Sequence, residues 1–261
     1  MNQESLITAE VRGNVLLIGV NRPAERNLFN MATIEALAAA YGRLEQDPEL
    51  RCGVLFANGK HFTLGLDLAD VVPALTQGDL TFPEGSFNPW GTSPPYRQKP
   101  LVCAVHGLCL TLGIELALAA DIRIAATGTR FAQLEVKRGI YPFGGATVRF
   151  VREVGWGNAM RYLLTGDEFS AEEAFRMGLV QEVVEPERLL PRAIELAESV
   201  ARQAPFGVRA TIRSARQAWL EGEKAAMADL FPALKDLLET EDAREGVQSF
   251  LERRSGNFRG R

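Results

Sequence analysis

Strand and helix patterns alternate through the first half of the chain. Residues 7–11 and 15–20 are mainly apolar or β-branched and flank Gly13, which predicts two short strands joined by a turn. A helix is expected next, with Asn30 as its N-cap. Its apolar positions recur at helical spacing: Ile34, Leu37, Ala38, Tyr41 and Leu44.

Three further strand patterns lead into or follow helices. Residues 53–57, 101–105 and 122–126 are short apolar runs of strand length. One helical pattern begins at about Leu68, and another carries Glu115. Repeated strand-then-helix units are typical of α/β proteins, so the sequence predicts an α/β fold.

The second half of the chain, from about Gly145, has mainly helical patterns. Ser170 and Glu173 have the spacing of a capping box and predict a helix start. Long amphipathic stretches follow Pro191 and Pro205. These helices either cap the core or build an oligomer.

One segment, residues 76–100, follows neither pattern. It is rich in proline and glycine and carries Phe82, Phe87, Trp90 and Tyr96. Such a segment is either a mobile loop or a lid. Its aromatic side chains either line a ligand pocket or pack only within the loop.

The composition is that of a globular protein with a sizeable core, since 46% of the 261 residues are hydrophobic and 24% are charged. The formal net charge of −4 argues against general attraction to nucleic acid or membrane surfaces. No apolar run reaches the roughly 18 residues of a membrane span, and the first residues lack the basic start of a secretory signal. A cytoplasmic location is therefore expected.

Cysteine and histidine are too few for a metal site. Cys52, Cys103 and Cys109 lie in apolar surroundings without a CxxC spacing, and His61 and His106 are the only histidines. The sequence supports neither a disulfide framework nor a zinc site.

Glu115 interrupts the otherwise apolar run of residues 112–120. On a helix it shares a face with Leu112, Leu118 and Ala119, where an unpaired charge is costly and the pKa of the carboxyl group should rise. A carboxyl group that titrates near neutrality can shuttle protons. The alternative is a partly exposed helix residue paired with an arginine.

Two glycine-containing turns precede helices. They lie at residues 61–68 and 107–113. In each turn, backbone N–H groups at the start of the helix have no helical acceptor, so they can bind a negatively charged group. Taken alone, a glycine before a helix more often allows the backbone to turn than marks an anion-binding site.

An ordered set of motifs resembles the enoyl-CoA hydratase and isomerase family, the crotonase superfamily, over nearly the whole chain. No single motif is decisive, but the order of the set is highly specific. The matching elements include Asn21-Arg22-Pro23, Phe62-x-x-Gly65-x-Asp67-Leu68, Gly107-x5-Gly113-x-Glu115-Leu116-Ala117, Asp121-Ile122-Arg123, Phe131-x-x-Leu134-Glu135 and Pro142-x-Gly144-Gly145.

The resemblance implies a ββα-spiral core at residues 1–200 that binds an acyl-CoA thioester. It also implies a helical region at residues 201–261 that forms a trimer, or a hexamer built from two trimers. The backbone N–H groups of Leu66 and Leu112 would form an oxyanion hole for the thioester carbonyl, and Glu115 and Glu135 would act as acid and base. Retention of both glutamates favours hydration of a 2-enoyl-CoA. No cofactor is expected, because coenzyme A is part of the substrate.

Further binding residues follow from the same resemblance. Arg26 and Lys60 lie in loops expected at the nucleotide end, where Arg offers forked donors and Lys a point charge to phosphate. The remaining expected contacts lie in or beside the motifs: Ala24, Leu64, Gly65, Asp67, Leu68, Gly113 and Leu134.

The chain departs from the family at Thr111-Leu112, where the hydratases usually have glycines. A leucine disfavours positive φ and adds bulk, so the second oxyanion donor or the acyl pocket is expected to change. Two alternatives stay open. One is isomerisation or another reaction through an enolate, and the other is a non-catalytic scaffold that binds acyl-CoA or RNA.

Overall fold

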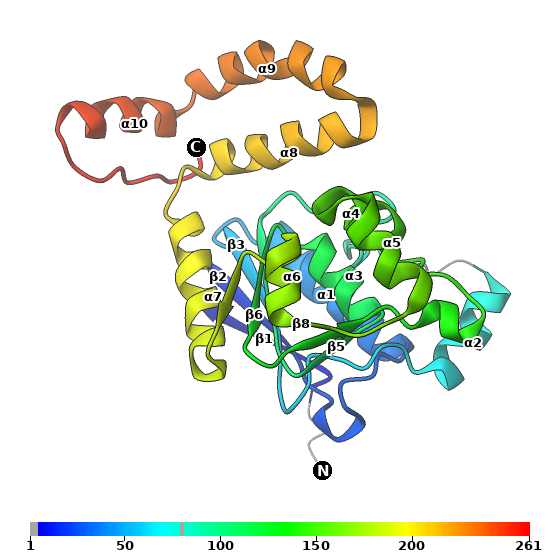
Figure 1. The fold of residues 1–261 in the computed structure, drawn as a ribbon. Coiled ribbons are helices and arrows are strands. Elements are labelled where there is room, and N and C mark those ends of the chain that lie inside the picture. The colour runs from blue at the N-terminus through cyan, green and yellow to red at the C-terminus, as the bar shows by residue number, and fades with distance from the viewer. Residues whose placement is uncertain (1–4, 79–80) are drawn as a thin grey trace.

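The computed structural model describes residues 5–78 and 81–261 (Figure 1). Residues 1–4 lie outside this part, and the expected lack of a secretory signal depends on them. Residues 79–80 of the 76–100 segment lie outside it as well. The strands are β1 (Ile7–Arg12), β2 (Val15–Val20), β3 (Cys52–Ala57), β4 (Leu101–Val105), β5 (Leu108–Leu110), β6 (Ile122–Ala126), β7 (Arg130–Ala132), β8 (Phe169–Ser170) and β9 (Glu182–Val184). The α-helices are α1 (Met31–Gln46), α2 (Leu68–Gln77), α3 (Leu112–Ala119), α4 (Ala146–Val154), α5 (Trp156–Thr165), α6 (Ala171–Met177), α7 (Pro186–Ala201), α8 (Pro205–Glu221), α9 (Glu223–Leu238) and α10 (Glu241–Leu251), and the 3-10 helices are η1 (Pro23–Glu25) and η2 (Glu135–Arg138).

The main sheet has six strands in the order β1-β2-β3-β4-β6-β9. The β1–β2 pair is antiparallel, and Gly13 in the turn between the two strands has a positive φ of 56° that suits glycine. The other neighbouring strands are parallel, as expected when helices connect them. The predicted α/β fold is confirmed.

Helices cover both faces of this sheet (Figure 1). On one face, α1 buries Leu37, Tyr41 and Leu44 in the larger core cluster, which also contains residues of α3. On the other face, α7 places Leu189 and Ile194 in a second cluster with residues of β3, β4 and β6. Strands buried on both faces are largely apolar, which explains the short continuous runs in the sequence.

Two predicted helix starts are confirmed by their capping bonds. The Asn30 side chain accepts a hydrogen bond from the Thr33 N–H at 2.9 Å, and the Ser170 hydroxyl accepts one from the Glu173 N–H at 3.3 Å. These bonds satisfy N–H groups that lack helical acceptors. Both helices therefore begin where their side-chain chemistry predicts.

The C-terminal half is less uniformly helical than the sequence indicates. The short strands β8 and β9 interrupt it. The amphipathic stretch after Pro191 is helical as expected, but its helix, α7, begins earlier, at Pro186. Pro186 occupies the first turn, where its missing N–H costs nothing. Pro191 lies inside α7 and removes one helical hydrogen bond, yet the helix continues to Ala201.

A second, three-stranded sheet has the order β5-β7-β8. Phe131 of β7 stacks on Phe169 of β8, with 5.3 Å between ring centroids. The strand β5 is followed at once by Thr111 and α3. This small sheet therefore fixes the N-terminus of the helix that carries Glu115.

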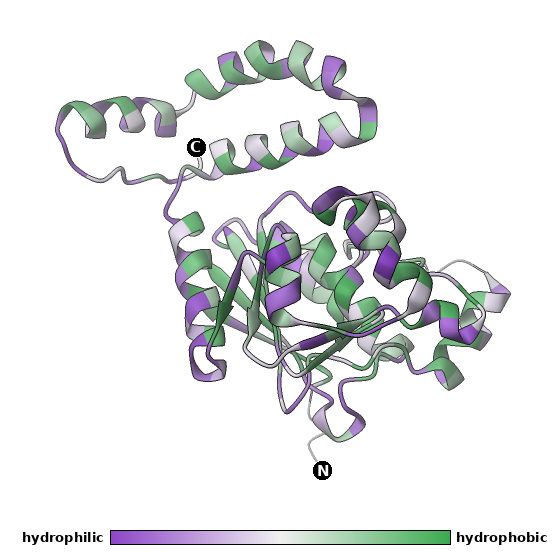
Figure 2. Ribbon diagram, viewed as in Figure 1, coloured by the Kyte–Doolittle hydropathy of each residue, from purple (hydrophilic) through white to green (hydrophobic). Residues whose placement is uncertain are grey.

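The helices α8, α9 and α10 extend away from the sheet and its covering helices (Figure 1). Arg216 of α8 anchors them through an ion pair with Asp121 at 3.1 Å and a hydrogen bond to the Arg97 carbonyl. Apolar residues are abundant on α8 and α9 (Figure 2), and Phe231 and Phe250 are each 81% exposed. The division at residue 200 stays a prediction, although α7 ends at Ala201.

None of the helices in the described ranges combines the length and apolar character that crossing a bilayer requires.

Candidate active site

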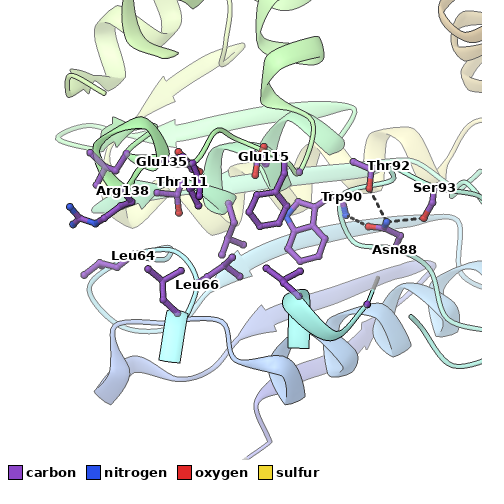
Figure 3. A pocket seen from close by; sticks show the side chains of 18 residues that line it. Leu64, Leu66, Asn88, Trp90, Thr92, Ser93, Thr111, Glu115, Glu135 and Arg138 are labelled. Carbon is purple, nitrogen blue, oxygen red and sulfur yellow. Dashed lines mark hydrogen bonds between the residues drawn. The ribbon is translucent and has the colours of Figure 1, made fainter. Parts of the chain in front are cut away.

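A pocket of about 730 Å³ lies between the N-terminus of α3, the turn before α2 and the 76–100 segment (Figure 3). Leu64 and Arg138 lie toward one end, and Asn88, Thr92 and Ser93 lie toward the other. The lining residues are Leu64, Leu66, Leu68, Leu75, Gly78, Asn88, Trp90, Thr92, Ser93, Thr111, Leu112, Glu115, Leu134, Glu135, Arg138, Ile140, Phe143 and Gly144.

The turn before α2 supplies one side of the pocket. Gly65 has a φ of 116°, and its carbonyl accepts a hydrogen bond from the Phe29 N–H at 2.9 Å. The Thr63 hydroxyl accepts a bond from the Gly65 N–H at 3.0 Å. This leaves the N–H of Leu66 without an acceptor within the described part of the chain, beside the pocket that Leu66 lines.

The N-terminus of α3 supplies a second free N–H group. Leu112 is the first residue of this helix, lines the pocket and is only 3% exposed. In residues 5–78 and 81–261, its N–H makes no hydrogen bond, as expected for a first-turn group. The positive φ lies on Thr111, at 50°, rather than on the leucine, because Leu112 already has helical geometry. The expected conformational conflict at Leu112 is therefore wrong.

Glu115 is buried in the wall of the pocket, 3% exposed. Its Oε1 accepts a hydrogen bond from the Ala146 N–H at 3.1 Å, at the N-terminus of α4. Burial raises the pKa of this carboxyl from 4.5 to about 7, and the charge of Glu135 adds to the rise, while N–H groups of Ala146 and Gly144 oppose it. The raised pKa expected from the apolar run is confirmed.

Glu135 lies at the start of η2 and is 7% exposed. Burial raises the pKa of its carboxyl to about 7 as well. Gln133, oriented so that its amide group satisfies its neighbours, lies 3.1 and 3.2 Å from the two carboxylate oxygens and donates to the Thr111 carbonyl at 3.0 Å. The backbone N–H of Glu135, which also bonds to the carboxylate, opposes the rise of this pKa. Sequence reasoning missed Gln133, and only its position two residues before Glu135 could have indicated it.

The 76–100 segment forms part of the pocket wall. The side-chain oxygen Oδ1 of Asn88 accepts from the Trp90 N–H at 3.0 Å, and the side-chain amide of Asn88 donates to the hydroxyls of Thr92 at 2.9 Å and Ser93 at 3.0 Å (Figure 3). Trp90 is 5% exposed and lines the pocket, so its aromatic ring does more than pack within the loop.

Arg149 of α4 holds this segment in place. Its guanidinium donates to the carbonyl of Trp90 at 2.6 Å and to that of Gly91 at 2.7 Å. Because α4 also binds Glu115 through Ala146, one helix organises both the buried carboxyl and the loop opposite it.

The structure brings together only some of the residues expected from the sequence. Seven of them line the pocket: Leu64, Leu66, Leu68, Leu112, Glu115, Leu134 and Glu135. Gly65 and Gly113 lie beside the lining backbone, and a side chain at Gly113 would approach Thr63 to 2.6 Å. Besides these two glycines, four more lie outside the lining: Ala24, Arg26, Lys60 and Asp67. Ala24 is exposed on η1, Arg26 and Lys60 are exposed on loops, and Asp67 precedes α2.

Arg138, Phe143 and Gly144 also line the pocket without having been expected there. A Cβ atom on Gly144 would lie 2.5 Å from Oε2 of Glu115, so this glycine gives the carboxyl group its space. In the described ranges, no group of three or more His, Cys, Asp or Glu residues is arranged to hold a metal ion.

Glu115→Gln is expected to stabilise the fold at alkaline pH. Folding raises the pKa of Glu115 from 4.5 to about 7. Below pH 4.5 the carboxyl group is protonated in both the folded and the unfolded protein, so it does not lower the unfolding free energy. As the pH rises from 4.5 through about 7, the unfolding free energy of the wild type falls. Glutamine keeps the shape and cannot ionise, so the variant should gain on the order of 3 kcal/mol of unfolding free energy above that range.

Thermal unfolding of both proteins at about pH 5 and about pH 8.5 measures this difference. The melting temperature of the variant should exceed that of the wild type only at the higher pH. An equal offset at both pH values would mean that ionisation of Glu115 is not the cause.

Comparisons with known proteins agree on one family. The model of the enoyl-CoA hydratase/isomerase family matches residues 10–261. The Mycobacterium tuberculosis protein named enoyl-CoA hydratase EchA19 is 36% identical over 260 residues, which cover 97% of this chain and 96% of that protein. The Escherichia coli 1,2-epoxyphenylacetyl-CoA isomerase is 34% identical over 261 residues and 98% of each chain.

A solved structure extends the likeness to three dimensions. The crystal structure of a probable enoyl-CoA hydratase/isomerase from Mycobacterium abscessus superposes with a TM-score of 0.97 at 52% identity, covering 99% of this chain and 100% of the other. The fold expected from the motifs is confirmed. This chain belongs to the enoyl-CoA hydratase/isomerase family.

Proposed function

We propose that this protein catalyses the reversible addition of water to a 2-enoyl-CoA thioester. The observation that carries the proposal is the pair of buried carboxyl groups, Glu115 and Glu135, that line one pocket and both have a pKa of about 7. The relatives that bear hydratase names support the same reaction class.

The free N–H groups of Leu66 and Leu112 act as the oxyanion hole in this proposal. The thioester carbonyl binds between them, and its oxygen gains negative charge as water adds to the double bond. Fixed donors aimed at that charge lower the barrier, and each contributes about 2.7 to 4 kcal/mol. The Leu66 N–H belongs to a hydrogen-bonded turn and the Leu112 N–H to the first turn of α3, so both donors are in place before the reaction.

Glu115 and Glu135 carry the protons. One carboxylate accepts a proton from water while the water oxygen bonds to C3 of the acyl group. The other carboxyl group donates its proton to C2, so that the atoms of one water molecule are added in total. With both pKa values near 7, a state with one protonated and one ionised carboxyl is well populated at neutral pH.

The nucleotide part of the substrate is proposed to extend from the end of the pocket where Arg138 and Leu64 lie. Arg138 is exposed there and can meet a phosphate through its forked donors. Arg26 and Lys60 lie outside the lining, but as exposed loop residues they remain candidates for phosphates farther along the ligand. The reaction as written needs no cofactor beyond the coenzyme A of the substrate. The cytoplasmic location stays a prediction from the sequence.

We also propose that α8 to α10 assemble the protein into a trimer or a pair of trimers. Exposed apolar groups gather on these helices, including Phe231, Phe250 and Trp219. Large exposed apolar patches mark protein–protein contacts. In sedimentation experiments the wild type should behave as three or six chains, and Phe231→Ser with Phe250→Ser should shift it toward monomer.

Phe175→Ser, on the core helix α6, is the matched control, because Phe175 is 54% exposed but lies outside these helices. A monomeric wild type would contradict the assembly proposal.

The mass of the product tests the reaction. Wild-type protein incubated with crotonyl-CoA or a medium-chain 2-enoyl-CoA should yield a thioester heavier by one water. Rearrangement of a 3-enoyl-CoA without a mass change would assign isomerisation instead. Protection against thermal unfolding by these thioesters, without turnover of either, would leave a binding role only.

A further inference from the structure

Thr111 has a backbone conformation that threonine rarely adopts. Its φ and ψ are 50° and −116°. In the described part of the chain, the other non-glycine residues with positive φ are Arg26, Asn27 and Arg253, and none of them is β-branched. Such a conformation is strained and persists only where the surroundings enforce it.

The surroundings of Thr111 do enforce it. The Thr111 N–H donates to the Ala132 carbonyl at 2.9 Å. The Thr111 carbonyl accepts from the N–H groups of Ile114 at 2.9 Å and Glu115 at 3.4 Å, and from the Gln133 amide at 3.0 Å. Both the N–H and the carbonyl group of Thr111 are therefore held by hydrogen bonds, and these bonds fix the direction of its side chain.

The hydroxyl group lies between the two backbone segments of the proposed oxyanion hole. A Cβ atom built on Gly65 would lie 2.3 Å from Oγ1 of Thr111 but 3.6 and 3.7 Å from its carbon atoms, so the hydroxyl is the part that contacts Gly65. Gly65 immediately precedes Leu66, and Thr111 immediately precedes Leu112. The hydroxyl thus lies beside the residue that precedes the Leu66 N–H and belongs to the residue that precedes the Leu112 N–H. Thr111, Leu66 and Leu112 all line the pocket, and the first two are labelled in Figure 3.

The hydroxyl also has a proton to give. Thr111 lines the pocket, and within residues 5–78 and 81–261 its Oγ1 makes no hydrogen bond. A hydroxyl donor held beside two N–H donors adds to their stabilisation of negative charge. A glycine at this position would relieve the strain but would supply no such group.

We propose that the Thr111 hydroxyl is a third hydrogen-bond donor to the thioester oxygen. The inference rests on the oxyanion hole of the proposed function. It makes Thr111 a catalytic residue. It also gives a chemical reason for a threonine at a position where the hydratases usually have glycine.

Three substitutions separate the hydroxyl from the shape of the side chain. Thr111→Val keeps the branched shape and the strain but removes the donor, whereas Thr111→Ser keeps the donor. Thr111→Gly removes both the donor and the strain, and it replaces the valine variant if that variant does not fold. Thr211→Val, at an exposed site on α8, is the control.

Two readouts are needed, hydration of a 2-enoyl-CoA and the pKa of bound acetoacetyl-CoA, whose enolate absorbs in the near ultraviolet. We expect Thr111→Val and Thr111→Gly to lower kcat/KM at least about tenfold and to raise the pKa of the bound ligand. Thr111→Ser should stay within about threefold of the wild type.

An unchanged ligand pKa and rate in Thr111→Val would overturn the inference while leaving the hydratase proposal intact. A faster Thr111→Gly would show that the strained threonine only obstructs the site. If the wild type lowers the pKa of bound acetoacetyl-CoA and Thr111→Val raises it again, but no enoyl-CoA is hydrated, the donor role stands and the hydration proposal fails.

Discussion

Glu115→Gln is expected to lower kcat for hydration of a 2-enoyl-CoA by about 10² to 10⁴-fold. Glutamine fills the same space and can still accept the hydrogen bond from the Ala146 N–H, so the pocket should keep its form. It cannot exchange a proton with water or with the α-carbon. The loss should therefore appear in kcat, with little change in substrate affinity.

Glu135→Gln should reduce kcat by a similar factor, because the reaction needs one proton acceptor and one proton donor. Steady-state kinetics of both variants, beside Glu187→Gln at an exposed site on α7, measure these effects. A variant that retains more than about a tenth of the wild-type rate would remove that glutamate from the proton transfers. Loss in only one variant would favour isomerisation, for which a single carboxylate suffices.

Gly144→Ala should reduce kcat/KM by about 10²-fold, although alanine is a small change. The new Cβ would lie 2.5 Å from Oε2 and 2.8 Å from Cδ of Glu115, and 2.8 Å from Cδ1 of Trp90. These contacts are too short, so the carboxyl group must move away from the reacting atoms. The substitution tests the position of Glu115 without changing its chemistry.

Gly157→Ala is the matched control for this experiment. Gly157 lies in α5, and nothing lies within 4 Å of the Cβ that alanine would add. It should leave the rate unchanged and stabilise the helix slightly. Equal activity of Gly144→Ala and the wild type would show that the placement of the Glu115 carboxyl is not critical.

The local chemistry of the sequence predicted much of the fold. Apolar runs of strand length, the caps at Asn30 and Ser170 and the helix through Glu115 all depend on residues close together in the chain. The strands β5, β7 and β8 were not predicted, because two or three residues carry too little pattern. They matter nonetheless, since they fix the N-terminus of α3.

The site was predictable only where a motif contained its residues. Glu115 could be singled out from one carboxylate in an apolar run, whereas Glu135 depended on the family resemblance. Gln133 and the contact of Gly144 with Glu115 were missed, because both depend on tertiary packing. Trp90 was named only as one of several aromatic residues that could line a pocket. The effect of Thr111-Leu112 was assigned to the wrong residue, since only the backbone shows that α3 begins at Leu112.

The pH dependence of wild-type hydration tests the central claim, that two buried carboxyl groups share the roles of acid and base. The pKa values of about 7 predict a bell-shaped profile of kcat/KM with a maximum near neutrality. The rate should fall at lower pH as the base becomes protonated, and at higher pH as the acid loses its proton. A rate that stays constant from about pH 6 to pH 9 would contradict the account.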